Sequence, residues 1–334
     1  MIAVVGAGSW GTALAIHLAR NGTAVRLCAR SAELASAIAA RRRNPWYLAD
    51  LELPPAVEVT TDAVAAAGAA DAIVIAVPSE FFAAALGRLT PARGVPIVSA
   101  TKGFDPVRHL RMSQLVRERF PTSPVAALSG PTFAREVAMA RPTAAVVAAA
   151  DDALATELQA RLGSRELRLY TNRDLVGVEA GGALKNVMAI ATGIADGLGL
   201  GENARAALIT RGLAEMTRLA VALGGEPTTL AGLAGLGDLV LTATGTLSRN
   251  RALGMALARG DSLARAAGSS RMIAEGVPTV RTALALASAH GVVMPICKEV
   301  AAVLFEGKAP AEALATLLGR VATREDAPTG GPRA

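Results

Sequence analysis

The chain begins MIAVVGAGSWGTALAIHLARNGTAVRLC, Met1 to Cys28, and this stretch decides the fold. The apolar run Ile2–Val5 predicts a buried strand, and it leads directly into the glycine turn Gly6–Gly11. The apolar spacing then predicts a helix through Ala19, followed by a second strand over Ala24–Ala29. Strand, glycine turn, helix and strand within about thirty residues form the usual context of a dinucleotide-binding G-x-G-x-x-G motif.

Each glycine of this motif has a separate physical reason. Gly6 permits the tight turn, Gly8 lets backbone N–H groups approach a pyrophosphate, and Gly11 lets the helix pack closely on the strand. The helix N-terminus then offers its partial positive charge to the phosphates. The alternative is an ordinary glycine turn without a ligand.

Arg30 lies at the end of the second predicted strand. A site that prefers NAD usually places an acidic residue there to bind the ribose 2′-hydroxyl, whereas arginine suits a 2′-phosphate. Arg30 therefore indicates tolerance of, or preference for, NADP, and Arg41–Arg43 would add positive charge. The alternative is that these arginines only form a solvated face.

Further apolar runs alternate with helical segments, and this predicts a doubly wound α/β sheet of the Rossmann type with parallel strands. We expect helices over Phe81–Leu89 and Arg111–Arg119. The additional predicted strands are Ala72–Val77, Pro96–Ala100, Val125–Leu128, Ala144–Ala148 and, as the last strand of the sheet, Leu167–Tyr170.

Three polar stretches follow predicted strands: Val77–Ser79, Ala100–Gly103 and Ser129–Ala134. Ligands of open parallel sheets bind beyond the carboxyl ends of the strands, so these stretches predict a cleft. Thr132 is also expected to cap a helix that begins near Phe133.

After Leu175 the pattern becomes helical, interrupted by glycine-rich turns. The sequence therefore predicts a Rossmann domain over residues 1–174 and an all-helical catalytic domain over residues 175–322. A polar tail containing proline and glycine, residues 323–334, is expected to be disordered.

The composition narrows the function. The net charge is +6, but the basic residues are scattered, so nucleic-acid binding is not expected and anionic small molecules are. Three histidines without metal-ligand spacing predict no metal site, and two cysteines predict no disulfide framework. Because the first predicted strand starts at once, we expect no signal peptide, and we expect no membrane span because no apolar stretch is long enough. We expect a soluble, cytoplasmic protein.

The helix predicted over Glu179–Ala191 carries Lys185 beside its apolar stripe, after the pair Gly181–Gly182. This pattern suggests an ammonium group held where another surface approaches closely. The alternative is a lysine whose stem covers the core while its head stays in water. Reduction of a ketone by a nicotinamide cofactor needs a proton donor, and the scarcity of histidine leaves Lys185 and Lys102 as candidates.

Two further stretches add polar groups to the second domain. Asp238 follows the glycine-rich run Gly232–Gly237; it is either part of a site or simply an N-cap. Ser248-Arg249-Asn250-Arg251 offers an arginine suited to binding a phosphate.

At this point the chain resembles bacterial NAD(P)-dependent glycerol-3-phosphate dehydrogenases over nearly its whole length. The resemblance lies in the motifs GAGSWGTALA (6–15), ATKG (100–103), SGPTFAREVA (129–138), EAGGALKNVMAIATGIADGLGLGENARAALITRGLAEM (179–216), GLAGLGDLVLTATGTLSRNR (232–251) and AEGVPT (274–279). It implies reversible reduction of dihydroxyacetone phosphate to sn-glycerol 3-phosphate, which supplies phospholipid synthesis, with NADP(H) or NAD(H) and no metal. Lys185 matches the catalytic lysine, the proton acceptor for the C2 hydroxyl group.

The resemblance also implies the binding residues. Positions that match substrate contacts are Lys102, Gly130, Thr132, Lys185, Asp238, Ser248, Arg249 and Asn250. Positions that match cofactor contacts, together with the glycine motif, are Gly6, Gly8, Ser9, Trp10, Gly11, Arg30, Lys102, Ala134, Arg249, Ile273 and Glu275. We further expect a homodimer formed through the helical domain.

Two rival interpretations remain. Hydroxyacid and phosphogluconate dehydrogenases also place a glycine pair before a catalytic lysine, but with asparagine four residues later; here the fourth residue is Ala189, and Asn186 follows the lysine directly. A non-catalytic NADP-binding sensor would leave Lys185, Asp238 and Arg249 without a common purpose.

Overall fold

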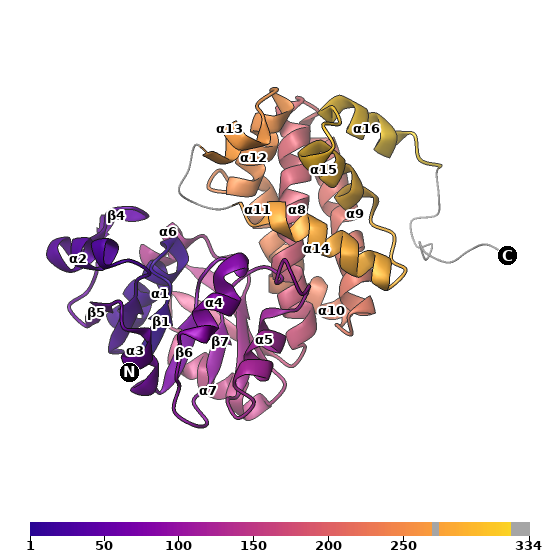
Figure 1. The fold of residues 1–334 in the computed structure, drawn as a ribbon. Coiled ribbons are helices and arrows are strands. Elements are labelled where there is room, and N and C mark those ends of the chain that lie inside the picture. The colour runs from indigo at the N-terminus through magenta and orange to yellow at the C-terminus, as the bar shows by residue number, and fades with distance from the viewer. Residues whose placement is uncertain (269–273, 322–334) are drawn as a thin grey trace. The chain divides into compact units, whose positions relative to one another are not determined.

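The computed structural model describes residues 1–268 and 274–321, and the chain forms two compact units (Figure 1). The first contains Met1–Asp105 and Leu110–Glu179; the second contains Pro106–His109 and the chain from Ala180 onward. The change from one unit to the other falls inside helix α8, Leu175–Gly197. The expected tail, residues 323–334, lies outside the described residues, as does Ile273.

The first unit is built on a mixed sheet of eight strands in the order β10-β9-β8-β7-β6-β1-β2-β5. The fold class expected from the sequence is confirmed, and a separate two-stranded hairpin, β3 (Arg43–Asn44) with β4 (Leu48–Glu52), adds to it. The strands of the main sheet are β1 (Ile2–Val5), β2 (Val25–Cys28), β5 (Val57–Thr60), β6 (Ala72–Ile75), β7 (Ile97–Ser99), β8 (Val125–Ser129), β9 (Thr143–Ala149) and β10 (Leu167–Asn172).

The expectation that all strands run parallel is wrong for one pair. β9 pairs antiparallel with β8, and β10 is parallel to β9, so these two strands run against the other six. A parallel return must carry the chain back along the length of the strand, usually through an α-helix. The connection from β8 to β9 contains only the short helix α6 (Ala134–Ala138), which packs against α1 (Ser9–Arg20), with the guanidinium of Arg20 donating to the carbonyl of Ala138.

Helices cover both faces of the sheet, which is why its central strands are apolar on both sides. Along β1, Val4 belongs to one buried core, whereas Ala3 and Val5 belong to the other. The first core also holds buried residues of α1, α2 (Ala32–Arg41) and α7 (Asp152–Leu162). The second holds buried residues of α3 (Ala63–Gly68), α4 (Phe82–Gly87) and α5 (Met112–Arg119), and the 3₁₀ turn η1 (Ser79–Phe81) precedes α4.

The elements that follow β10 are all helices in the described part of the chain. After α8 they are α9 (Gly201–Ala222), α10 (Pro227–Leu230), the π-helical turn η2 (Leu233–Gly237), α11 (Asp238–Thr244), α12 (Arg249–Ala258), α13 (Leu263–Gly268), α14 (Gly276–Ala289), α15 (Pro295–Phe305) and α16 (Pro310–Leu318).

Helix α8 is the buried centre of the second unit. It is apolar almost all round, and every residue from Ala180 to Ala195 is buried. Glycines bring its neighbours unusually close: a Cβ on Gly193 would lie 2.1 Å from the carbonyl oxygen of Arg251, and one on Gly254 would lie 2.2 Å from that of Ile190. The backbones of α8 and α12 therefore touch, which fixes α12 and the residues before it relative to α8.

Candidate active site

The glycine turn in the first unit has the geometry that close packing demands at Gly6 and Gly11. Gly6 has φ +112°, and a Cβ there would lie 2.6 Å from the carbonyl oxygen of Ala76. A Cβ on Gly11 would lie 1.8 Å from the carbonyl oxygen of Gly6. Neither position accepts a side chain, because the contacting atoms are backbone.

Gly8 is different, because its surroundings are open. Apart from Gly8 itself and its two chain neighbours, no described residue has a heavy atom within 4 Å of a Cβ built at this position, which is the N-cap of α1. Among the described residues no side chain caps this helix end. An open backbone surface at the start of a helix, beside the carboxyl end of β1, fits the phosphates of a dinucleotide.

Four further residues of the first unit are implied in cofactor binding: Ser9, Trp10, Arg30 and Ala134. Ser9 is the first residue of α1, and Trp10 and Ala134 are partly buried and pack against the first core. The buried Nε1 atom of Trp10 has no hydrogen-bond partner among the described residues. Arg30 is exposed beyond β2, and its guanidinium lies 5.8 Å from the ring centroid of Phe81.

The arginine triple at positions 41–43 does not act as one charged patch. Arg42 has a left-handed backbone with φ 51°, and its guanidinium donates to the carbonyl oxygens of Val57 (3.0 Å), Leu53 (3.1 Å) and Pro54. Arg42 therefore stabilises the chain between β4 and β5, and only its two neighbours are left as candidates for contact with a ligand.

Lys102, Gly130 and Thr132 come together at the carboxyl ends of β7 and β8. The ammonium group of Lys102 donates to the carbonyl oxygen of Gly130 (2.7 Å) and to Oγ1 of Thr132 (3.1 Å), and the Thr132 hydroxyl donates to the same carbonyl (3.0 Å). The prediction that Thr132 caps a helix is wrong, because α6 begins at Ala134 with Phe133 at its N-cap. The hydroxyl group instead fixes the loop.

Lys185 is buried in the second unit, with its side chain only 9% exposed. Its Nζ lies 3.1 Å from Oδ1 of Asp238 and donates to Oγ1 of Thr242 at 2.7 Å (both on α11). The Thr242 hydroxyl donates in turn to the backbone carbonyl of Asp238 at 2.7 Å. A lysine with its head in water is therefore excluded: Lys185 is a buried cation held by a carboxylate and a hydroxyl.

The glycines around Lys185 explain how the pair forms. A Cβ on Gly181 would lie 2.7 Å from the carbonyl oxygen of Ala234, so the π-helical turn η2 lies directly against α8. Asp238 is the first residue of α11 and has helical backbone angles, and the N-cap of this helix is Gly237 rather than Asp238. The close approach allowed by glycine brings its side chain, which is 1% exposed, to Lys185.

A second network lies beside this pair. The side-chain amide of Asn250 donates to Oδ1 of Asn186 (2.9 Å), and Oδ1 of Asn250 accepts from the backbone N–H of Gly276 (3.0 Å). Asn186 follows Lys185, and Gly276 follows Glu275, so the structure brings these predicted positions together. Ser248 caps α12 by accepting from the N–H of Arg251 (3.2 Å), and Arg249 is the first residue of that helix.

Thr242 and Asn186 are the two residues of this region that the sequence analysis did not single out. Thr242 stands four residues after Asp238, one helical turn along the same face, and this spacing was the signal available. Asn186 is adjacent to Lys185 in the sequence. Both side chains contact predicted site residues directly.

No cluster of three or more His, Cys, Asp or Glu side chains suited to a metal ion occurs in residues 1–268 and 274–321. Within the same ranges no single helix is long and apolar enough to cross a membrane, although one bent pair, Pro227–Thr244 with Arg249–Ala258, meets the criteria of length and composition.

A doubly wound sheet with an open glycine turn, followed by a helical unit with a buried lysine–aspartate pair, defines a two-domain dinucleotide-dependent dehydrogenase. Comparisons with known proteins show to which family of dehydrogenases the chain belongs. The sequence matches the NAD-dependent glycerol-3-phosphate dehydrogenase N-terminus over residues 1–155 and the corresponding C-terminus over residues 174–315.

Individual relatives agree. The chain is 49% identical to glycerol-3-phosphate dehydrogenase [NAD(P)+] of Koribacter versatilis, with 97% of this chain and 98% of the relative covered. It is also 49% identical to the enzyme of the same name from Geobacter sulfurreducens, over 96% and 97% of the two chains. A crystal structure of glycerol-3-phosphate dehydrogenase from Coxiella burnetii superposes with a TM-score of 0.91 at 40% identity, over 96% and 98% of the chains.

The chain belongs to the family of NAD(P)-dependent glycerol-3-phosphate dehydrogenases. It is an oxidoreductase that uses a nicotinamide dinucleotide and acts on a small phosphorylated substrate. The interpretations as a hydroxyacid dehydrogenase and as a non-catalytic sensor are thereby excluded.

Proposed function

We propose that this enzyme catalyses the reversible reduction of dihydroxyacetone phosphate to sn-glycerol 3-phosphate with NADPH or NADH. The product would supply glycerophospholipid synthesis in the cytoplasm. Membership of the family supports the pair of substrates. The direction, the pathway and the compartment are expectations from the sequence.

Lys185 is the proposed acid and base of the reaction. The observation that carries this role is its burial beside Asp238, with 3.1 Å between Nζ and Oδ1. A buried lysine fixed by two partners holds its ammonium group in a defined place within apolar surroundings, where a proton transfer is best oriented. In reduction, Lys185 donates a proton to the C2 carbonyl oxygen; in oxidation, the neutral amine takes a proton from the C2 hydroxyl. The bound dinucleotide supplies or accepts the hydride at C2.

Asp238 and Thr242 are proposed to position Lys185. Asp238 balances the charge of the ammonium group, and Thr242 accepts one of its hydrogen bonds at 2.7 Å. Because the Thr242 hydroxyl also donates to the backbone carbonyl of Asp238, the side chains of Lys185, Asp238 and Thr242 form one hydrogen-bonded cluster between α8 and α11. A change in any member is expected to move the Nζ atom.

The remaining polar positions are proposed to hold the substrate and the cofactor. Lys102, whose ammonium group is fixed by Gly130 and Thr132, is suited to an anionic or carbonyl oxygen. Arg249, at the start of α12, is proposed to bind the substrate phosphate, beside Ser248 and Asn250. The proposed cofactor contacts are Gly6, Gly8, Ser9, Trp10, Gly11, Arg30, Lys102, Ala134, Arg249, Ile273 and Glu275, of which Ile273 lies outside the described residues.

Two structural proposals complete this function. We expect residues 1–174 to bind the dinucleotide and residues 175–322 to supply the substrate and catalytic residues. We also expect a homodimer through the helical domain, which measurement of the mass in solution would test.

The decisive experiment replaces Lys185 with alanine. Lys185→Ala should abolish turnover of dihydroxyacetone phosphate while NADPH affinity, followed by quenching of Trp10 and Trp46, stays close to that of the wild type. Arg259→Ala, a change at an exposed cation of the same unit outside the proposed sites, is the matched control and should retain full activity. Substantial turnover by the Lys185→Ala protein would remove this residue from its proposed role.

Substrate and cofactor are tested by oxidation of NADPH and of NADH with dihydroxyacetone phosphate. Rapid oxidation supports the reductive reaction, and the ratio of the two rates tests Arg30. If folded protein that binds NADPH oxidises neither cofactor, the assigned substrate is wrong.

A further inference from the structure

The second unit contains a groove of about 410 Å³ that the proposed reaction does not use. It lies over the end of α14, the turn into α15 and the C-terminal end of α16. This volume falls within the range of small-molecule pockets. The lining residues are Leu284, Ala287, Ser288, Val292, Val293, Met294, Pro295, Lys298, Glu299, Thr316, Leu317 and Arg320. We call this site the cationic groove.

The charges of the cationic groove are unbalanced. Glu299 is buried, and its carboxylate accepts from the ammonium group of Lys308 at 2.6 Å; Lys308 also donates to Oγ1 of Thr316 at 2.8 Å. Lys308 therefore neutralises Glu299. The other two ionised residues in the described lining, Lys298 and Arg320, are both exposed cations. Their field favours an anion.

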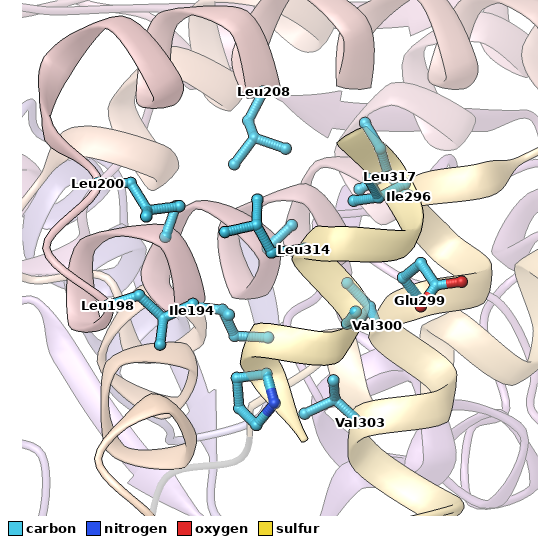
Figure 2. Close-up of a pocket in the computed structure, with 14 residues that line it drawn as sticks. Ile194, Leu198, Leu200, Leu208, Ile296, Glu299, Val300, Val303, Leu314 and Leu317 are labelled. Atoms are coloured by element: carbon cyan, nitrogen blue, oxygen red, sulfur yellow. The ribbon is translucent and has the colours of Figure 1, made fainter. Parts of the chain in front are cut away.

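The remaining lining is largely aliphatic, and the groove shares two lining residues with a second space. Glu299 and Leu317 also line an apolar cavity of about 40 Å³ under α16. Figure 2 shows Glu299 at the edge of this cavity, whose other labelled side chains are leucine, isoleucine and valine. The cavity admits only about three groups of the size of water, because each needs roughly 10–15 Å³. It suits the end of an alkyl chain rather than a whole ligand.

We propose that the cationic groove binds an amphiphile with one anionic head group and a medium-length alkyl chain. The head group, a carboxylate or a phosphate monoester, lies against Lys298 and Arg320. The chain lies along Leu284 and Val292 and points toward Leu317 and the apolar cavity. The site is separate from Lys185 and Asp238, because its lining shares no residue with them.

The test uses the full-length protein and three probes below their micellar concentrations: decanoate, decyl phosphate and the neutral decanol. Titration calorimetry should show saturable binding of at least one anion with one site per chain, about tenfold tighter than decanol, since a hydrogen bond to a charged group contributes roughly a factor of ten. Decanoate alone, decyl phosphate alone, or both binding in this way each supports the site and identifies the head group.

The double variant Lys298→Gln/Arg320→Gln should weaken anion binding about tenfold. Arg211→Gln/Arg259→Gln, which removes two exposed cations of the same unit outside the lining, should leave it unchanged. Ser288→Trp, at the exposed rim, should block all three probes while the melting temperature stays near that of the wild type.

The opposite results overturn the proposal. They are the absence of saturable binding of both anions, equal binding of decanol, or an affinity that neither the double variant nor Ser288→Trp reduces. Because none of these measurements uses turnover, failure of this proposal is distinct from failure of the proposed reaction.

Discussion

The ion pair between Lys185 and Asp238 makes a prediction that separates its structural role from its chemical one. Asp238→Asn keeps the shape of the side chain but removes the charge that balances a lysine whose side chain is only 9% exposed. Lys185→Met removes the other partner and leaves a carboxylate that is 1% exposed. In each single variant one buried charge has lost its opposite charge.

The size of the effect follows from the burial. Removing one partner of a buried ion pair costs about 3–5 kcal/mol of the free energy of unfolding, because the remaining charge is left uncompensated. At the lower end of that range, the melting temperature of a unit of this size falls by about 6–12 °C, at roughly 2–4 °C per kcal/mol. The double variant Lys185→Met/Asp238→Asn has no charge left to compensate. It should therefore lose far less than the sum of the single variants, with a coupling of about 3 kcal/mol.

The assay has to follow the unfolding of the second unit, which contains Lys185 and Asp238. Trp10 and Trp46 both lie in the first unit, so tryptophan fluorescence is unsuitable, and helical circular dichroism during urea unfolding is the better signal. Asp261→Asn is the control, because its partner Arg265 is 82% exposed and such pairs contribute little. If the two single variants and the double variant are additive within about 0.5 kcal/mol, the charges do not interact as their 3.1 Å separation implies, and the reasoning is refuted.

Three further predictions concern other parts of the chain. Gly8→Ala should fold normally, because only open space surrounds its Cβ position, but it should bind NADPH weakly, because a side chain there would keep the pyrophosphate away from the backbone N–H groups. Gly11→Ala should fail to fold stably, because its Cβ would meet the carbonyl oxygen of Gly6 at 1.8 Å. Equal melting temperatures of the two variants would contradict this prediction. Burial raises the pKa of Glu215 from 4.5 to about 7, although it accepts from the N–H groups that begin α15. The folded state thus binds a proton more tightly than the unfolded state, so the stability from this residue is fully present below pH 4.5 and is lost as the pH rises through about 7. Comparison of wild type with Glu215→Gln by urea unfolding from pH 4.5 to 8 should show this difference, and parallel profiles would exclude it. Arg30→Glu should lower the rate with NADPH relative to NADH, measured with both cofactors at subsaturating concentration, and an unchanged ratio would remove Arg30 from the 2′-phosphate.

Local features of the fold were predictable because their causes lie within a few residues. The first strand was expected at Ile2–Val5 and is β1, and the second was expected at Ala24–Ala29 and contains β2. An apolar run of this length followed by a glycine turn has few alternatives. The hairpin of β3 and β4 was not expected, because its residues are mostly polar or exposed and carry no alternating pattern.

The sequence does not predict the contacts of a side chain that has several possible hydrogen-bond partners. Thr132 is a plausible cap by type, but its hydroxyl bonds to the loop of Gly130 instead. Arg42 looks like a surface cation, yet three backbone carbonyl groups bind its guanidinium. Side-chain type indicates which hydrogen bonds a residue is able to make, whereas the position of the backbone decides which of them forms.

The sequence by itself determined the class of fold, the glycine turn and the motifs that mark Lys185, Asp238 and Asn250. These depend on the order of residue types along the chain. Only the tertiary structure decided the reversed direction of β9 and β10 and the burial of Lys185 between Asp238 and Thr242. Lys185 and Thr242 are 57 residues apart in the sequence, and they meet because the contact of Gly181 with Ala234 brings two helices together. Such a contact depends on the packing of the whole unit, which no local pattern records.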